Sequence, residues 1–160
     1  MKPKPYSETD QELILQKIRY FCSYQERYTR EVVEKLKDWA VQRQKIPGII
    51  NRLQQEGFLN EKRFVKAFCG GKFRTNKWGR QKITFELKIR GIPESMIPVG
   101  LAEIDEKEYR ITLKNLILRK QAETGSEKNL NARVKIVNFV SVKGYEMNLI
   151  LEIMKKLHIE

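Results

Sequence analysis

Positive charge is concentrated in one short stretch of this chain, from Glu61 to Gly91. The stretch holds ten lysine and arginine residues against two glutamates, and so supplies eight of the twelve net positive charges of the chain. Clustered bases attract phosphate groups, and an aromatic ring among them can stack on an exposed nucleobase. We therefore expect a surface here that binds nucleic acid. Its candidate residues are Lys62, Arg63, Lys66, Lys72, Arg74, Lys77, Trp78, Arg80, Lys82, Lys88 and Arg90.

Helical spacing would bring several of these bases onto one surface. Arg80, Thr84 and Lys88 succeed one another at intervals of four residues, on the side of a predicted helix that faces away from its apolar stripe. Lys62 and Lys66 have the same spacing on the preceding helix. Two neighbouring helices can thus present one cationic face.

The residues that enzymes use are not arranged for catalysis in this sequence. The single histidine, His158, has no serine, cysteine or carboxylate in a pattern typical of nucleophilic catalysis. Gly70-Gly71-Lys72 lacks the spacing of a phosphate-binding loop and is more typical of a turn between helices. We expect no enzymatic activity, no cofactor and no metal site.

The composition, 41% hydrophobic and 32% charged, is typical of a folded globular protein. Cys22 and Cys69 both fall within predicted amphipathic helices, which indicates buried thiols in a reducing compartment. No stretch approaches the roughly 20 apolar residues that span a bilayer. We expect a cytoplasmic monomer that does not enter membranes.

The elements that must position the bases are helices. Residues 1–6 carry two prolines and should form a loose tail, and Ser7 with Asp10 resembles a capping box. A first helix is then expected over about 8–23, and a second begins at a Thr29 cap. A third has Pro47 in its first turn and ends at a left-handed Gly57.

The basic stretch has the same plan. Asn60 should cap its first helix, and the link to the next helix is expected from Gly70 to Trp78. That next helix begins near Gly79 and ends at a left-handed Gly91. Pro93 should open a helix towards Ile104, with Pro98 bending or shortening it from inside.

A third copy of this plan completes the chain. An offset of 51 residues maps Ile46-Pro47 onto Ile97-Pro98, and an offset of 53 maps Arg90-Gly91 onto Lys143-Gly144. Asp105 caps its first helix, a second begins near Leu130, and a third covers about 146–157. The β-branched residues at 134–142 could form a strand, but the repeat register favours a helix ending before Lys143-Gly144.

The expected fold class is all-α, with tandem three-helix repeats that stack into an elongated, curved array with an open surface. The expected divisions are a tail at 1–6 and repeats at 7–57, 58–104 and 105–160.

Three motifs in the middle repeat resemble the RecX family. They are GFLNEKRF, KWGRQKI and FELKIRGI, in the family's order and at plausible spacing. The positions that match its signature are Gly57, Phe58, Leu59, Arg63, Phe64, Phe68, Lys77, Gly79, Ile83, Leu87, Gly91 and Ile92. The outer repeats resemble the family less: the first has Ala40 where the middle one has Gly91, and the third has Asn138 and Ser141 within its predicted helix.

The resemblance implies a bacterial regulator of the recombinase RecA. Such proteins bind in the groove of the RecA filament on single-stranded DNA, and commonly inhibit its activities in recombination, DNA repair and the SOS response. The partners implied are the RecA filament and single-stranded DNA, with double-stranded DNA as a further candidate. The alternative is an autonomous helix-turn-helix protein that reads duplex DNA with a helix beginning at Arg80-Gln81-Lys82.

Overall fold

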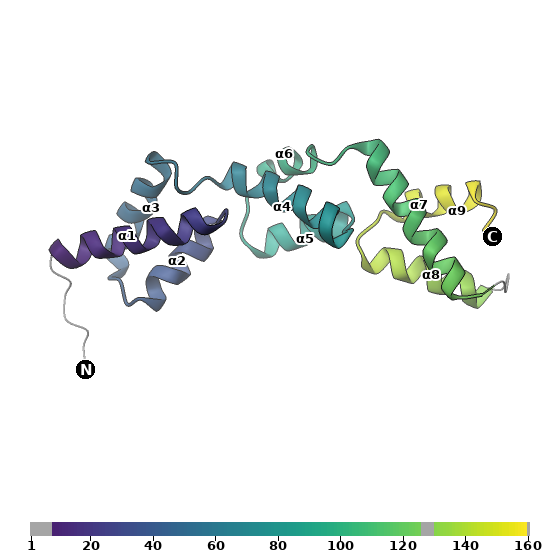
Figure 1. Cartoon of the computed structure of the whole chain (residues 1–160), viewed down its shortest axis with the longest axis horizontal. Coiled ribbons are helices and arrows are strands. Elements are labelled where there is room, and N and C mark those ends of the chain that lie inside the picture. Colours follow the sequence, from purple (N-terminus) through teal and green to yellow (C-terminus); the bar gives the residue numbers. More distant parts are fainter. Residues whose placement is uncertain (1–7, 126–129, 160) are drawn as a thin grey trace.

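The computed structural model describes residues 8–125 and 130–159. These residues form an elongated, gently arched row of helices (Figure 1) and include no strand. The predicted tail at 1–6 and the cap at Ser7 lie outside the described residues. The helices come in three triplets: α1 (Glu8–Tyr24), α2 (Thr29–Asp38) and α3 (Ile46–Gln55); α4 (Glu61–Asn76), α5 (Arg80–Ile89) and α6 (Ile97–Leu101); α7 (Glu106–Glu123), α8 (Leu130–Val142) and α9 (Met147–Lys156).

Two of the predicted helix starts are confirmed by side-chain caps. Asn60 Oδ1 accepts a hydrogen bond from the Arg63 amide, and Asp105 Oδ2 accepts one from the Glu108 amide, each at 3.0 Å. The prediction of Thr29 as a cap is wrong, because Thr29 is already the first residue of α2. Its amide instead donates to a carboxylate oxygen of Glu61, in the next triplet, at 3.1 Å.

The left-handed helix stop is confirmed at Gly91, where φ is +77°. Ala40 adopts the same conformation after α2, with φ of 57°, although its Cβ makes that backbone unfavourable. The two residues therefore occupy equivalent places in successive triplets. The backbone follows the same path at both places, although one residue is alanine and the other is glycine.

The predicted link from Gly70 to Trp78 is wrong, because α4 continues through both glycines as far as Asn76. The apolar stripe of α4 includes Cys69 and reaches Phe73, which is buried with 4% exposure. Burial of a phenylalanine contributes about 2 kcal/mol, which offsets the helix cost of two glycines, about 1 kcal/mol each. The connection to α5 is only Lys77 to Gly79.

The prediction that Pro98 lies inside a helix is also wrong. A 3₁₀ turn at Glu94–Met96 comes first, and Pro98 then lies in the first turn of α6, as Pro47 does in α3. Gly100 packs α6 closely onto α4, since a Cβ there would collide with the side chain of Val65.

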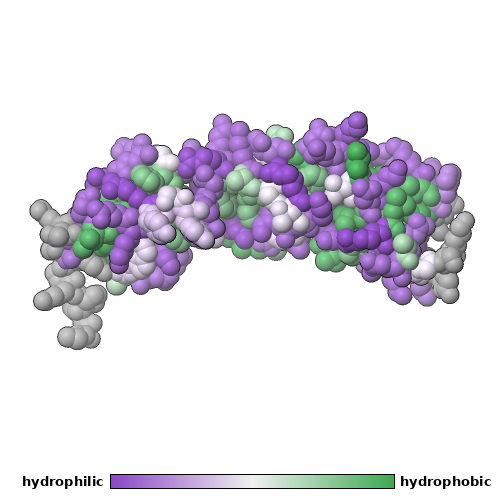
Figure 2. Space-filling view, viewed as in Figure 1, coloured by the Kyte–Doolittle hydropathy of each residue, from purple (hydrophilic) through white to green (hydrophobic). Residues whose placement is uncertain are grey.

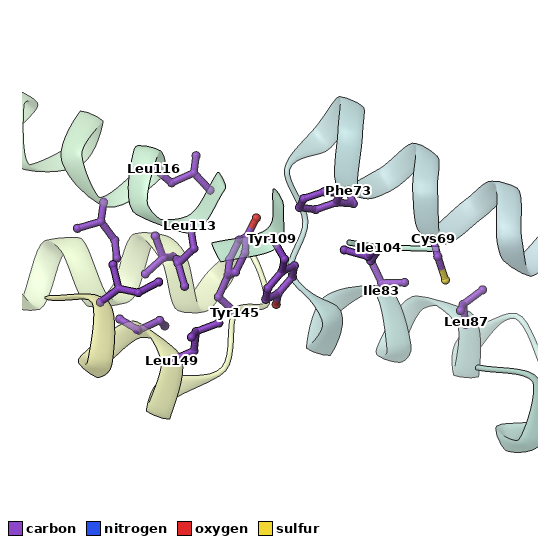
Figure 3. Packing of buried hydrophobic residues seen from close by; sticks show 14 of the residues in the cluster. Cys69, Phe73, Ile83, Leu87, Ile104, Tyr109, Leu113, Leu116, Tyr145 and Leu149 are labelled. Carbon is purple, nitrogen blue, oxygen red and sulfur yellow. The ribbon is translucent and has the colours of Figure 1, made fainter. Parts of the chain in front are cut away.

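The buried residues form two separate cores. One joins α1–α3 with Leu59, and the other runs without interruption from α4 to α9. Figure 3 shows the second core, with Tyr109 and Tyr145 between the residues of the middle triplet and those of the last. The α8 segment is a helix, as its register predicted. Ile136 and Val140 are buried in the core, whereas Val134 is 47% exposed.

Both cysteines are buried and free, and burial raises the pKa of the Cys22 thiol to about 11 and that of Cys69 to about 12. In the described part of the chain, no helix is long and apolar enough to cross a bilayer. The repeat boundaries at residues 57 and 104 stay a prediction.

Candidate nucleic-acid interface

The segment between α4 and α5 is held against the third triplet by backbone hydrogen bonds. The Gly79 amide donates to the Lys143 carbonyl at 2.7 Å, and the Gln81 amide donates to the Gly144 carbonyl at 2.9 Å. The Tyr145 hydroxyl donates to the Lys77 carbonyl at 2.9 Å. These bonds fix Trp78, between Lys77 and Gly79, at the junction of the two triplets.

Tyr109 completes this junction from α7. Its hydroxyl accepts a hydrogen bond from the Arg80 amide at 3.0 Å and donates to the carboxylate of Glu146 at 3.0 Å. Burial raises the pKa of the Tyr109 phenol, so the hydroxyl remains a donor even at alkaline pH. The Arg80 guanidinium lies 3.8 Å from the Tyr109 ring centroid and pairs with Glu106.

Half of the ten predicted bases are paired with carboxylates inside the fold. Most of the partners belong to neighbouring segments that the charge count of the stretch did not include. The pairs are Arg63 with Glu26 (2.6 Å), Lys66 with Glu103 (3.5 Å), Lys88 with Glu94 (3.2 Å), Arg90 with Glu86 (2.7 Å), and Arg80 with Glu106 and Glu146. The predicted face of α4 and α5 is therefore partly neutralised at Lys66, Arg80 and Lys88.

Two of the other bases flank Trp78. The Lys72 and Lys82 ammonium groups lie 5.0 and 4.6 Å from its ring centroid. Trp78 is half-buried, and its ring stands edge-on to Phe68 at 6.4 Å between centroids. The Trp78 ring thus packs partly against the core and also contacts the two ammonium groups.

The last three of the ten bases take part neither in these ion pairs nor in the contacts with the Trp78 ring. Lys62, Arg74 and Lys77 are exposed. Lys77 Nζ donates to the Arg74 carbonyl at 2.7 Å and so covers the end of α4.

The third triplet adds three cations that the sequence analysis missed. Arg119, Lys120 and Lys143 lie 5.7, 5.1 and 5.5 Å from the ring centroid of Phe139. Phe139 and Lys143 are one helical turn apart, which was a weak signal. The position of α7 beside them could not be foreseen.

A close contact brings the two sets of cations together, because Lys82 lies against Gly144, the residue that follows Lys143. In agreement with this contact, the pKa of the Lys143 ammonium group is lowered by burial, by repulsion from Arg119 and then by repulsion from Lys82. We call the set that includes these residues the junction cluster: Lys72, Trp78, Lys82, Arg119, Lys120, Phe139 and Lys143. Its cations would gain from an anion that relieves their repulsion.

Among the described residues, one cation of the junction cluster forms an ion pair with a carboxylate. Lys120 pairs with Glu123 at 3.3 Å, while no carboxylate in residues 8–125 or 130–159 forms an ion pair with Lys72, Lys82, Arg119 or Lys143. Hydrophilic side chains dominate the face of the molecule in Figure 2. Such a group, in which four of the five cations have no carboxylate partner among the described residues and two aromatic rings lie beside them, can hold phosphates and stack on a base.

The duplex-reading alternative fits this geometry poorly. A recognition helix inserts its N-terminal residues into the major groove. At the N-terminal end of α5, the Gln81 amide bonds to the Gly144 carbonyl, so the third triplet lies against this end of the helix. The Arg80 side chain, which would have to reach a base edge, is held by Glu106 and Glu146.

Comparisons with known proteins agree on one family. Residues 60–97 match the family model described as "RecX, second three-helix domain". Over 141 residues the chain is 24% identical to a regulatory protein RecX of Streptococcus agalactiae, a match that covers 88% of the chain and 54% of that protein. A regulatory protein RecX of Streptomyces coelicolor is 21% identical over 131 residues, or 81% of the chain and 69% of that protein. The chain thus spans about half the length of the Streptococcus relative.

The fold agrees as well. The crystal structure of RecX from Lactobacillus salivarius superposes with a TM-score of 0.82 at 22% identity, over 91% of this chain and 95% of that one. The resemblance to the RecX family is therefore confirmed, together with the all-helical fold. The relatives are named as regulatory proteins and not as enzymes.

Proposed function

We propose, from the RecX domain at residues 60–97 and the RecX fold of the chain, that this protein binds the RecA filament on single-stranded DNA. It would modulate RecA, most simply by inhibition, in recombination, DNA repair and the SOS response. No catalytic step belongs to this chain, since the nucleotide chemistry is carried out by the recombinase. The protein would act as a monomer in the cytoplasm.

The observation that carries the proposal is the junction cluster. Lys72, Lys82 and Lys143 come from two triplets and converge without carboxylate partners among the described residues. Cations that repel one another in the free protein favour a polyanion, because bound phosphates remove the repulsion and release counterions. The other predicted bases, from Lys62 to Arg90, would add a weaker and more general attraction.

The filament offers such a polyanion in a fixed geometry. A rigid, elongated chain can lie along a helical partner and meet it at more than one point. We propose that the junction cluster faces the DNA phosphates of the filament, and that the flanking triplets contact the recombinase.

The test compares two triple variants that remove the same charge. Lys72→Gln, Lys82→Gln and Lys143→Gln together should weaken binding to single-stranded DNA and reduce the salt slope of the affinity by about two units. Lys107→Gln, Lys114→Gln and Lys155→Gln, three exposed lysines of the third triplet, should change both less. Equal losses in the two triples would mean that the charge acts only as a general field.

RecA itself provides the second readout. The unmodified protein, added at stoichiometric amounts, should lower the DNA-dependent ATP hydrolysis of the cognate RecA. The junction triple should lose most of this effect, and the control triple should keep it. No effect of the unmodified protein on RecA would overturn the proposal.

A further inference from the structure

A second aromatic surface lies on the first triplet, away from the basic stretch. Seven residues line a hollow of about 580 Å³ on α1 and the end of α2: Gln16, Lys17, Tyr20, Phe21, Tyr24, Arg27 and Trp39. Four of them are aromatic and two are cationic, and no carboxylate is among them. We call this surface the aromatic pocket.

The helical repeat explains why these side chains share one face. On α1, Tyr20 and Phe21 lie three and four residues after Lys17, and Tyr24 lies four and three residues after them, so the four side chains share one face. Trp39 follows Asp38, the last residue of α2. Phe21 and Trp39 pack in part against the first core. Tyr20 and Tyr24 are 72% and 75% exposed, so the core does not explain why two large rings stand there.

Three cations lie over the rings of the aromatic pocket. Lys17 Nζ is 5.9 Å from the Trp39 centroid, and Lys35 Nζ is 5.4 Å from the Phe21 centroid and 5.8 Å from that of Trp39. The Arg27 guanidinium lies 3.7 Å from the Phe21 centroid.

These cations differ in what else they bind. Arg27 pairs with Glu31 at 2.8 Å and donates to the Phe21 carbonyl at 3.1 Å, so it holds the ring in place. Lys17 and Lys35 form no ion pair with a carboxylate of the described residues, and their charges can serve a ligand.

From this geometry we infer that the aromatic pocket binds unpaired nucleobases of single-stranded nucleic acid. Bases stack on the exposed faces of Tyr20 and Tyr24 and on Trp39, and the adjoining phosphates meet Lys17 and Lys35. This inference rests on the proposed function for its ligand class, and adds a second contact at the opposite end of the molecule from α9 (Figure 1).

The balance of charge gives this site a different signature from that of the junction cluster. Residues 7–57 contain nine lysines and arginines against eight acids. Long-range attraction to phosphate is therefore weak here, and affinity comes from stacking, at about 1–3 kcal/mol per base. Binding at the aromatic pocket should depend on the bases present and only slightly on salt.

The two tryptophans of the chain allow each site to be observed alone. Trp78→Phe leaves Trp39 as the single tryptophan, in the aromatic pocket, and Trp39→Phe leaves Trp78, in the junction cluster. The probes are an oligothymidylate and an abasic strand of equal length, which has the phosphates but no bases. In the Trp78→Phe protein, oligothymidylate should quench Trp39 fluorescence and the abasic strand should not.

Point variants then test the exposed rings. Tyr20→Ala and Tyr24→Ala should each weaken the affinity for oligothymidylate, measured by the quenching of Trp39, about ten-fold. Tyr20→Phe and Tyr24→Phe should preserve this affinity, because stacking needs only the ring. Both tyrosines are exposed, so the circular dichroism of the variants should match that of the parent.

The outcomes separate this inference from the proposed function. Quenching of Trp78 without quenching of Trp39 overturns the inference and leaves the proposed function intact, whereas quenching of neither overturns both. Equal quenching of Trp39 by the abasic strand overturns the inference, because the contact would then be to phosphate alone. So would tyrosine variants that lose RecA binding but keep DNA binding, since the pocket would then hold a protein segment.

Discussion

Gly79 lies so close to Gly144 that a Cβ atom on Gly79 would collide with the carbonyl group of Gly144. This contact joins the middle triplet to the last one and is reinforced by the hydrogen bond from Gly79 to Lys143 at 2.7 Å. Because Trp78 and Lys82 are the near neighbours of Gly79, the same contact holds both sides of the junction cluster in register.

The first prediction concerns this contact. Gly79→Ala should lower the free energy of unfolding by about 2 kcal/mol, since the two backbones must move apart to admit a methyl group. The backbone at Gly79, with φ of −80°, suits alanine, so the cost is steric. Gly71→Ala is the control, because it adds a methyl group in open space within α4 and should raise stability by about 1 kcal/mol. Urea unfolding measures both, and a neutral Gly79→Ala would contradict the rigid junction.

A second prediction concerns alkaline pH. Burial raises the pKa of the Tyr109 and Tyr145 phenols above the ordinary value of 10. The folded state therefore keeps protons that the unfolded state loses above pH 10, and stability should be full below that pH and fall as pH rises beyond it. Tyr109→Phe should make this fall shallower.

The same substitution has a separate effect at neutral pH. It removes the Tyr109 hydroxyl that accepts from the Arg80 amide and donates to the Glu146 carboxylate, and the loss of these two hydrogen bonds should cost about 1–2 kcal/mol. Tyr20→Phe is the control, since the Tyr20 side chain is 72% exposed. Urea unfolding at neutral and at alkaline pH checks both effects, and identical pH profiles for Tyr109→Phe and the parent would contradict them.

A third prediction concerns acid. Glu56 accepts hydrogen bonds from Arg19 at 2.8 Å and from Arg52 at 2.9 Å, and these lower its pKa from 4.5 to about 2. Its contribution to stability should be present above pH 4.5 and be lost as pH falls through about 2. Glu56→Gln should therefore flatten the acid side of the stability profile. Glu34→Gln should not, because the Glu34 side chain is 59% exposed and its one ion pair within residues 8–125 and 130–159 is with Lys37. A titration of Glu56 by NMR that gives an ordinary pKa would contradict this prediction.

A fourth prediction rests on the two separate cores. Leu53 and Leu87 are both fully buried, one in each core, so Leu53→Ala and Leu87→Ala are matched substitutions that should each cost about 3 kcal/mol locally. Hydrogen exchange should show faster opening of α1–α3 alone for Leu53→Ala, and of α4–α9 for Leu87→Ala. Equal loss of protection throughout the chain in either variant would mean that the protein opens as one unit.

The sequence by itself determined the helices and the family resemblance. Their signals are local: an apolar stripe repeats every turn, Asn60 and Asp105 cap the helices that begin after them, and Gly57, Gly91 and Gly144 supply the left-handed backbone at helix ends. In the basic stretch, a local signal failed where a distant contact outweighed it. The glycines of α4 stayed helical because Phe73 is buried beside Tyr109, at 5.8 Å between ring centroids.

Which bases are available to a ligand was decided by the tertiary structure alone. A charge count along the chain treats Arg63 and Lys82 alike, but folding brings Glu26 to within 2.6 Å of Arg63 and brings Lys143, which lies next to Gly144, towards Lys82. The energy of two charges depends on the distance between them in space. The sequence does not give this distance for charges that lie in different triplets. Composition could therefore locate a basic region, whereas only the folded arrangement of the triplets shows which of its bases meet a carboxylate of the described residues.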